Sequence, residues 1–127
     1  MERTRGKPRD DCLACQDGLK EHECDRLGSV YLLKCNICDH SYIGETHRKV
    51  RERIAEHSFQ ARNKKTDTAW GEHMRTEHPD VIIKKTPILT AKLIATSTKH
   101  TVRKFREAIE IRDRKPTVNR TKGWALI

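Results

Sequence analysis

The fold of this chain is set by the stretch from Ser29 to His57, which reads SVYLLKCNICDHSYIGETHRKVRERIAEH. Within it, residues 30–33 and 41–43 have the character of β-strands, and each of these two segments carries one tyrosine, Tyr31 or Tyr42. The connection between the segments is short, which predicts an antiparallel pair of strands. The two tyrosines should therefore lie in the same part of one sheet.

A basic, helix-patterned run follows directly. Its predicted span is about 47–62, with Thr46 as the cap. The apolar stripe of this helix consists of Val50, Ile54 and Ala61. Arg53 and His57 lie four residues apart, so their side chains should project from one face of the helix. At this spacing alone an arginine and a histidine are typical of a solvated helix face.

Two pairs of potential metal ligands flank this helix. Cys35 and Cys38 form a C-x2-C pair between the two strands. His73 and His78 form an H-x4-H pair at a second short helix, which should end before Pro79. Two thiolates and two imidazoles make a complete tetrahedral zinc set that leaves no position open for a substrate. The alternative is buried cysteines with unpaired surface histidines. The complete set predicts a structural zinc site that supplements a small core.

Residues 1–27 are predicted to form a basic lead-in, and residues 28–127 the domain itself. A second set of potential zinc ligands falls in the lead-in, namely Cys12, Cys15, His22 and Cys24. Three thiolates and one imidazole could close another tetrahedral site. The alternative is a linker with free cysteines, in which the histidine is unrelated to them.

The composition limits both the core and the class of partner. Of the 127 residues, 35% are hydrophobic and 35% are charged, so one domain with a small core is expected. The net charge of +9 favours a polyanion such as DNA, although a merely soluble basic surface has the same composition. Neither a membrane span nor a signal peptide is recognisable, so no membrane partner is expected. In a reducing compartment, paired cysteines are better explained as metal ligands than as disulfides.

The second half of the chain should supply a third strand and a last helix. The strand is expected within residues 88–94, and Pro87 before it favours a sheet edge. The helix is expected from about Lys99 to Arg114, with Ser97 or Thr98 as its cap. Its predicted buried side consists of Val102, Phe105, Ala108, Ile109 and Ile111.

Glu107 lies among these apolar positions, where a carboxylate needs a partner. Pro116 ends the helix, and Asn119 follows three residues later. Together with Ile111 these residues give the pattern E-x3-I-x4-P-x2-N.

Three blocks of the chain resemble the GIY-YIG endonucleases. Ser29-Val30-Tyr31 and Tyr42-Ile43-Gly44 resemble the two halves of the family signature, with Ser-Val-Tyr in place of Gly-Ile-Tyr. The pattern from Glu107 to Asn119 resembles the third block of the family. The Cys and His pairs and the continuation of the signature resemble the version attached to Penelope-like retroelement reverse transcriptases. That continuation comprises Gly44, Glu45, Thr46, Arg48, Arg53, Glu56 and His57.

The resemblance implies an α+β fold within the broad α/β class, a three-stranded antiparallel sheet flanked by helices and stapled by zinc. It also implies a DNA endonuclease. In that family scheme Tyr31 would activate a water molecule with help from His57, and Tyr42 would position phosphate or water. Glu107 would be the only protein ligand of one Mg²⁺ or Mn²⁺ ion.

The remaining implied roles concern phosphate and orientation. Arg53 would pair with the scissile phosphate, for which a guanidinium fork is suited. Arg48 and Lys49 would join Arg53 in binding DNA. Asn119 would orient groups either on the metal side or on the tyrosine side, and the sequence does not distinguish these two options.

A retroelement enzyme of this type would nick target DNA in the nucleus and expose a 3′ end for a partner reverse transcriptase and its RNA. The chain could be a fragment of a longer protein or a stand-alone descendant. Two other functions compete with this one: a zinc-containing DNA-binding module without catalysis, and a repair or restriction nuclease on the same fold.

Overall fold

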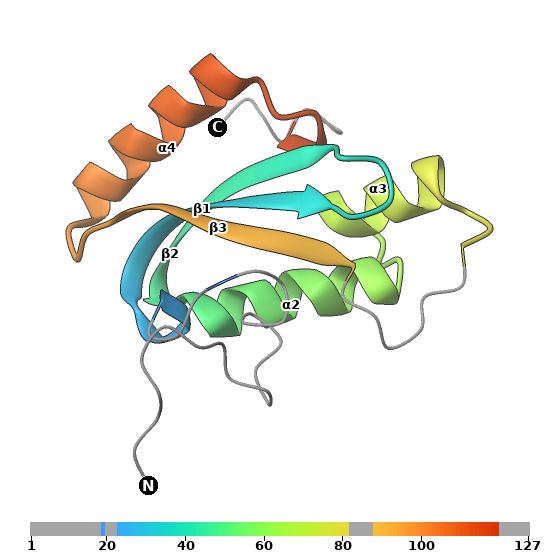
Figure 1. The fold of residues 1–127 in the computed structure, drawn as a ribbon, viewed down its shortest axis with the longest axis horizontal. Helices are drawn as coiled ribbons and strands as arrows, with labels where there is room; N and C mark the ends of the chain where they lie inside the picture. Colours follow the sequence, from blue (N-terminus) through green and yellow to red (C-terminus); the bar gives the residue numbers. More distant parts are fainter. Residues whose placement is uncertain (1–18, 20–22, 82–87, 120–127) are drawn as a thin grey trace, which may run out of the picture.

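The computed structural model describes Leu19 and residues 23–81 and 88–119 (Figure 1). A short 3-10 helix, η1 (Glu23–Asp25), leads into the first strand. The strands are β1 (Leu27–Cys35), β2 (Ser41–Lys49) and β3 (Leu89–Thr96). The helices are α2 (Val50–Arg62), α3 (Ala69–Glu77) and α4 (His100–Arg114). This is the small α+β domain that the sequence predicts.

The three strands form one antiparallel sheet in the order β2-β1-β3. The predicted hairpin and third strand are thereby confirmed, and β3 lies at an edge. Pro87, which suggested an edge position, lies outside the described residues. Because β1 is central, β2 forms the other edge. Tyr42, one of the predicted site residues, therefore lies on an edge strand of the sheet.

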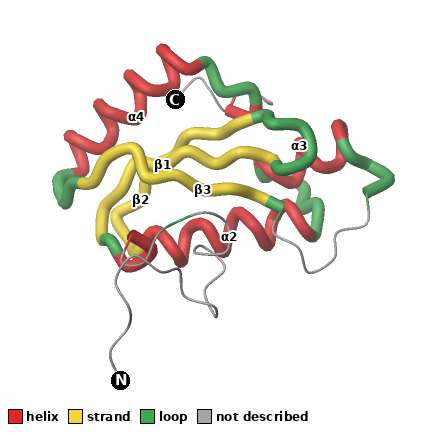
Figure 2. The backbone as a smooth tube through the Cα atoms, in the orientation of Figure 1, coloured by secondary structure: helices red, strands yellow, loops and turns green. Residues whose placement is uncertain are grey.

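Helices cover both faces of the sheet, with α2 and α3 on one side and α4 on the other (Figures 1 and 2). The main core lies between the sheet and the α2–α3 pair. It includes Tyr31, Leu33, Val50, Ile54, Ala61, Trp70, Met74, Leu89 and Ala91. The predicted apolar stripe of α2 is therefore buried as expected. None of the helices in the described part of the chain is long and apolar enough to span a membrane.

The start of α2 differs from the prediction. The helix begins at Val50, because residues 44–49 continue β2 and pair with β1. Thr46 does not cap the helix; its hydroxyl accepts a hydrogen bond from the Arg48 amide at 3.1 Å within the strand. The Val50 amide instead donates to the carbonyl of Arg26 at 3.1 Å. Hydrogen bonds along the strand pair outweigh the local capping signal here.

The start of α4 also differs from the prediction. Its N-cap is Lys99, which makes no side-chain capping bond. Ser97 accepts a hydrogen bond from the Lys99 amide at 3.1 Å, which belongs to the turn before the helix. Neither Ser97 nor Thr98 is therefore the cap.

The predicted buried side of α4 is wrong: three of its five residues are exposed, and the other two, Ile109 and Ile111, are only half-buried. Val102 and Phe105 are 48% and 70% exposed, and Ala108 is exposed as well. The helix instead buries Arg103, whose guanidinium pairs with Glu45 of β2 at 2.9 Å. This buried ion pair therefore helps to set the rotation of α4 about its axis.

Little of the predicted lead-in can be described. Cys24 is buried within η1, whereas Cys12, Cys15 and His22 lie outside the described residues. The second zinc site therefore stays a prediction.

Candidate active site and metal centre

The two signature tyrosines lie on the same face of the sheet. Tyr31 is paired with Gly44 across the β1–β2 ladder, and Tyr42 is paired with Leu33. A Cβ atom at Gly44 would lie 2.6 Å from the Tyr31 hydroxyl and 2.8 Å from Cε1 of Tyr42. Such contacts are too short for any side chain, so a glycine at this position allows the two tyrosines to converge.

Tyr31 and His57 form a buried hydrogen-bonded pair. The Tyr31 hydroxyl lies 2.8 Å from His57 Nε2, and both side chains are almost completely buried. Burial raises the pKa of Tyr31 well above its usual value, and repulsion from Tyr42 adds to this. Burial, with help from the Arg53 charge, lowers the pKa of His57 to about 3. His57 is therefore a neutral imidazole at neutral pH, and its Nδ1 has no hydrogen-bond partner among the described residues.

Arg53 brings a positive charge to both tyrosines. Its charge lowers the pKa of each tyrosine, which opposes the larger effect of burial. Glu56 holds the guanidinium in place through an Nη1–Oε1 contact of 2.8 Å. The same carboxylate oxygen accepts from Arg48 Nη2 at 2.7 Å. These two bonds lower the pKa of Glu56 to about 2, so it stays ionised and orients both arginines.

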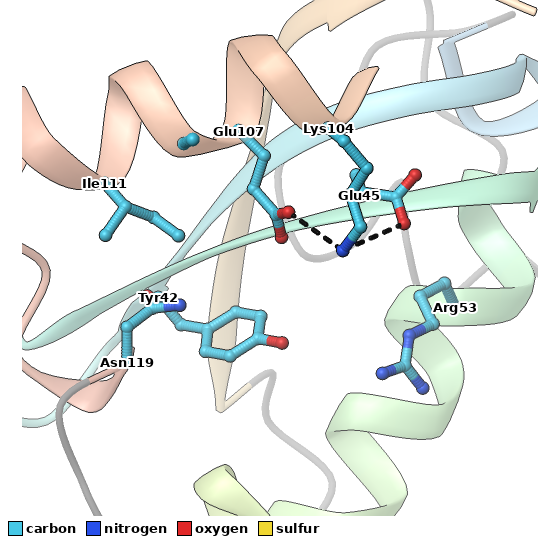
Figure 3. A pocket seen from close by; sticks show the side chains of 8 residues that line it. Tyr42, Glu45, Arg53, Lys104, Glu107, Ile111 and Asn119 are labelled. Atoms are coloured by element: carbon cyan, nitrogen blue, oxygen red, sulfur yellow. Dashed lines mark hydrogen bonds and ion pairs between the residues drawn. The ribbon is translucent and has the colours of Figure 1, made fainter. Parts of the chain in front are cut away.

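A cavity of about 500 Å³ lies at the edge of β2, where α2 and α4 approach from opposite faces of the sheet (Figure 3). It contains four of the six predicted catalytic residues. Its lining consists of Tyr42, Glu45, Arg53, Lys104, Glu107, Ala108, Ile111 and Asn119. Residues from β2, α2, α4 and the segment after α4 thus meet in one place.

A second cavity of about 220 Å³ shares Tyr42 and Arg53 with the first. His57 lines this smaller cavity, together with Gln60, Asp67, Thr68 and Ala69. Tyr42 and Arg53 therefore stand between a cavity that contains Glu107 and a cavity that contains His57. Tyr31 is fully buried directly behind this junction, on the other side of Gly44.

The side chain of Glu107 extends from α4 into the larger cavity. Its half-buried carboxylate has a charged partner there. The Lys104 ammonium lies 3.3 Å from Glu107 Oε1. Burial raises the pKa of Glu107, and the charge of Lys104 opposes that rise. The Glu107 carboxylate is half-buried, is paired with the Lys104 ammonium and faces a cavity. Such a carboxylate is suited to a divalent metal ion that keeps several water ligands.

Asn119 lines the larger cavity and bonds to the strand that carries Tyr42. Its Oδ1 accepts from the Ile43 amide at 2.6 Å, and its Nδ2 donates to the Ile43 carbonyl at 2.9 Å. Both bonds hold the backbone of β2 between Tyr42 and Gly44. Asn119 thus fixes the position of the signature strand.

The four predicted zinc ligands come together, with all of their ligand atoms within 4.8 Å of one another. Cys35 Sγ lies 3.6 Å from His78 Nε2, and Cys38 Sγ lies 3.3 Å from His73 Nε2. Burial lowers the pKa of His73 to about 4, so this imidazole is neutral, as a metal ligand must be. The cluster could hold a metal such as zinc, and it joins the hairpin to α3.

Trp70 lies between this Cys and His cluster and the candidate active site. Its ring lies edge-on to His73 with centroids 5.3 Å apart, and 6.2 Å from the ring of Tyr42. Trp70 is fully buried. Because Trp70 belongs to α3, a change in the orientation of α3 would move a ring that lies beside Tyr42.

Two charged residues of the cavity received no site role from the sequence, namely Glu45 and Lys104. Glu45 directly follows the signature glycine, and Lys104 lies three residues before Glu107 on the same helix face. Both positions could have been found from these spacings.

Comparison with known proteins supports one family. No curated protein and no solved structure matches the chain. The model of the GIY-YIG catalytic domain matches residues 27–119, which include both tyrosine strands, α2, α4 and Asn119. The match covers well over half of the chain, so this protein belongs to the GIY-YIG catalytic domain family.

Proposed function

We propose that this protein is a DNA endonuclease that hydrolyses phosphodiester bonds with one divalent metal ion bound at Glu107. The family match gives a nuclease-type fold. The observation that carries the proposal is that Tyr42 and Arg53 line two cavities at once, one with Glu107 and one with His57.

The two cavities suit an in-line displacement at phosphorus. In such a reaction the attacking and leaving oxygens lie on opposite sides of the phosphate. A phosphate paired with Arg53 would stand at the junction of the cavities. The smaller cavity would then hold the attacking water, and the larger one the departing 3′ oxygen. The Tyr42 hydroxyl reaches the same junction and would position the phosphate or the water.

Tyr31 and His57 would remove the proton from the attacking water. The Tyr31 hydroxyl bonds to a neutral imidazole, so His57 can accept the hydrogen of that hydroxyl. A tyrosine is a weak acid with an ordinary pKa of about 10, and burial raises it further. The nearby Arg53 charge and the acceptor on His57 act in the opposite direction. Tyr31 lines neither of the two cavities, so the water would have to reach its hydroxyl from the smaller cavity beside His57; Tyr31 would then take up a proton of the water as its own passes to His57.

Glu107 would hold a single Mg²⁺ or Mn²⁺ ion through one carboxylate, with water and phosphate oxygens completing the shell. When bound, the ion supplies positive charge beside the leaving oxygen. The cavity of about 500 Å³ has room for these additional ligands.

The charge of the protein suits DNA as the substrate. The net charge of +9 favours a polyanion, because bound phosphates release condensed counterions. Arg48 and Lys49 end β2 beside α2 and are half-buried at the approach to Arg53. They would bind phosphates next to the one that is cut.

The Cys35–Cys38–His73–His78 cluster and the run after the signature favour a retroelement role. The enzyme would nick target DNA in the nucleus, and the exposed 3′ end would prime synthesis by a reverse transcriptase domain on its RNA. The zinc site would act structurally in this scheme, because four protein ligands leave no position for substrate.

Cleavage of supercoiled plasmid with Mg²⁺ or Mn²⁺ tests the nuclease proposal. Glu107→Gln should abolish metal-dependent nicking. Glu110→Gln is the matched control, because Glu110 lies on the same helix and pairs only with Arg106 and Arg114 among the described contacts. A zinc-loaded, folded protein that binds DNA and never cuts would favour the non-catalytic zinc module. Equal cutting by both variants would contradict the assignment of Glu107.

A further inference from the structure

Lys104 lines the larger cavity, and the chemistry proposed above leaves it without a role. Its ammonium lies between two carboxylates, 3.3 Å from Glu107 Oε1 and 3.8 Å from Glu45 Oε2 (Figure 3). The side chain of Lys104 is 43% exposed, against 17% for Glu107 and 15% for Glu45. Lys104 is thus the most exposed of these three side chains, which leaves its ammonium group room to reorient within the cavity.

Glu45, by contrast, is fixed. Its Oε1 accepts from Arg103 Nε at 2.9 Å, and Arg103 is itself buried and donates to the Ser97 carbonyl at 3.0 Å. The second oxygen of Glu45 faces Lys104. Glu45 therefore offers the ammonium a permanent partner inside the cavity, independent of Glu107.

We propose that Lys104 is a further active-site residue, which neutralises Glu107 before a divalent ion binds and contacts a phosphate of the DNA afterwards. This inference rests on the proposed function, since it requires a metal ion at Glu107. An ammonium 3.3 Å from the ligand oxygen would lie close to a divalent cation on the same oxygen, and the two charges repel. Lys104 must then leave Glu107, and Glu45 keeps it in the cavity.

The position left to Lys104 faces the substrate. Arg53 lines the opposite wall of the same cavity, on α2 (Figure 3). A phosphate at Arg53 would thus lie between a guanidinium from α2 and an ammonium from α4. A cation brought to a phosphate in this way stabilises the charge that develops there during the reaction.

Lys104→Met tests the inference, because methionine keeps most of the length of the side chain and removes the charge. At saturating Mn²⁺ and DNA, single-turnover cleavage should slow about 10- to 100-fold, the loss typical of a hydrogen bond between charged groups. Lys104→Arg keeps the charge and should retain most of the rate. Arg106→Met is the matched control, because it removes one charge from the same helix outside this cavity.

A second measurement needs no activity. Mn²⁺ is titrated into the zinc-loaded protein without DNA, and paramagnetic broadening of the α4 amide signals near Glu107 is followed by NMR. Lys104→Met should bind Mn²⁺ about two- to fivefold more tightly than the wild type, since a partly exposed competing ion pair is lost. A slower reaction together with tighter metal binding is a combination that a merely structural role would not produce.

The outcomes separate the two proposals. If Glu107→Gln binds Mn²⁺ as the wild type does, the metal site itself is wrong, and the proposed function fails with it. If Glu107→Gln loses Mn²⁺ but Lys104→Met cuts at the wild-type rate, only the role of Lys104 is overturned. Unchanged or weaker Mn²⁺ binding by Lys104→Met would likewise overturn the exchange at Glu107.

Discussion

The buried pair of Tyr31 and His57 should make the stability of the fold depend on pH below neutrality. The pKa of His57 is lowered to about 3 in the folded protein, mainly by burial. In the unfolded chain a histidine has a pKa of about 6.5. Between these two values the unfolded chain binds a proton that the folded protein does not. The contribution of His57 to stability is thus complete above about pH 6.5 and is lost as the pH falls toward 3.

The size of this effect follows from the same two values. One pKa unit corresponds to about 1.36 kcal/mol, so the free energy of unfolding should fall by about 2 kcal/mol between pH 7 and pH 5. His57 is 3% exposed, so solvent screening reduces this figure little. A loss of 2 kcal/mol is a large part of the stability of a small domain.

Urea unfolding at pH 7 and pH 5 measures the effect, with His57→Gln as the reference. Glutamine keeps a hydrogen-bonding group toward Tyr31 and does not titrate. The zinc ligands titrate in the same range, but both proteins carry them, so their contribution cancels in the difference. Wild type should lose about 2 kcal/mol more than His57→Gln. An equal loss in the two proteins would show that His57 is protonated in the folded state and would refute its placement as a neutral acceptor.

Three further predictions concern groups around the signature strand. Gly44→Ala should lower the free energy of unfolding by about 1–3 kcal/mol and abolish cutting, because the added methyl group would clash with both tyrosine rings. Thermal unfolding and the plasmid assay measure these two effects. Asn119→Ala should cost about 2 kcal/mol in urea unfolding, because it leaves the Ile43 amide and carbonyl without partners, whereas Asn119→Asp should cost less. If free zinc is 100–1,000 times its Kd, chelation of zinc should lower the free energy of unfolding by about 3–4 kcal/mol. In Cys38→Ser, which lacks one ligand, the melting temperature should no longer respond to the chelator.

The sheet and the metal cluster could be predicted because their signals are local and mutually consistent. Alternation in β1 and the short connection to Tyr42 are enough to place the two tyrosines on one face. The C-x2-C and H-x4-H pairs have the right ligand types, and the structure brings them within 4.8 Å. Spacing alone did not show that His57 pairs with Tyr31, which depends on how α2 packs against the sheet.

The boundaries could not be predicted, because distant partners decide them. Thr46 has the chemistry of a cap, yet β1 offers it and its neighbours a strand partner, so β2 runs to Lys49. The same applies to Asn119. Its residue type allowed several roles, and only the packing of the chain after α4 shows that its amide bonds to the backbone of Ile43.

The largest failure of sequence reasoning lies on α4, the helix that carries Glu107 and Lys104. An apolar stripe normally predicts the buried side of a helix. On α4 the side turned toward β2 is charged instead, and Phe105 is left 70% exposed. Rotating α4 to bury Phe105 would turn Glu107 and Lys104 away from the cavity. The helix therefore cannot bury Phe105 and also keep these two residues in the cavity. The Arg103–Glu45 pair holds the orientation that serves the site. The local rule fails on the same helix face to which we assign Glu107 and Lys104, as is expected where function competes with packing.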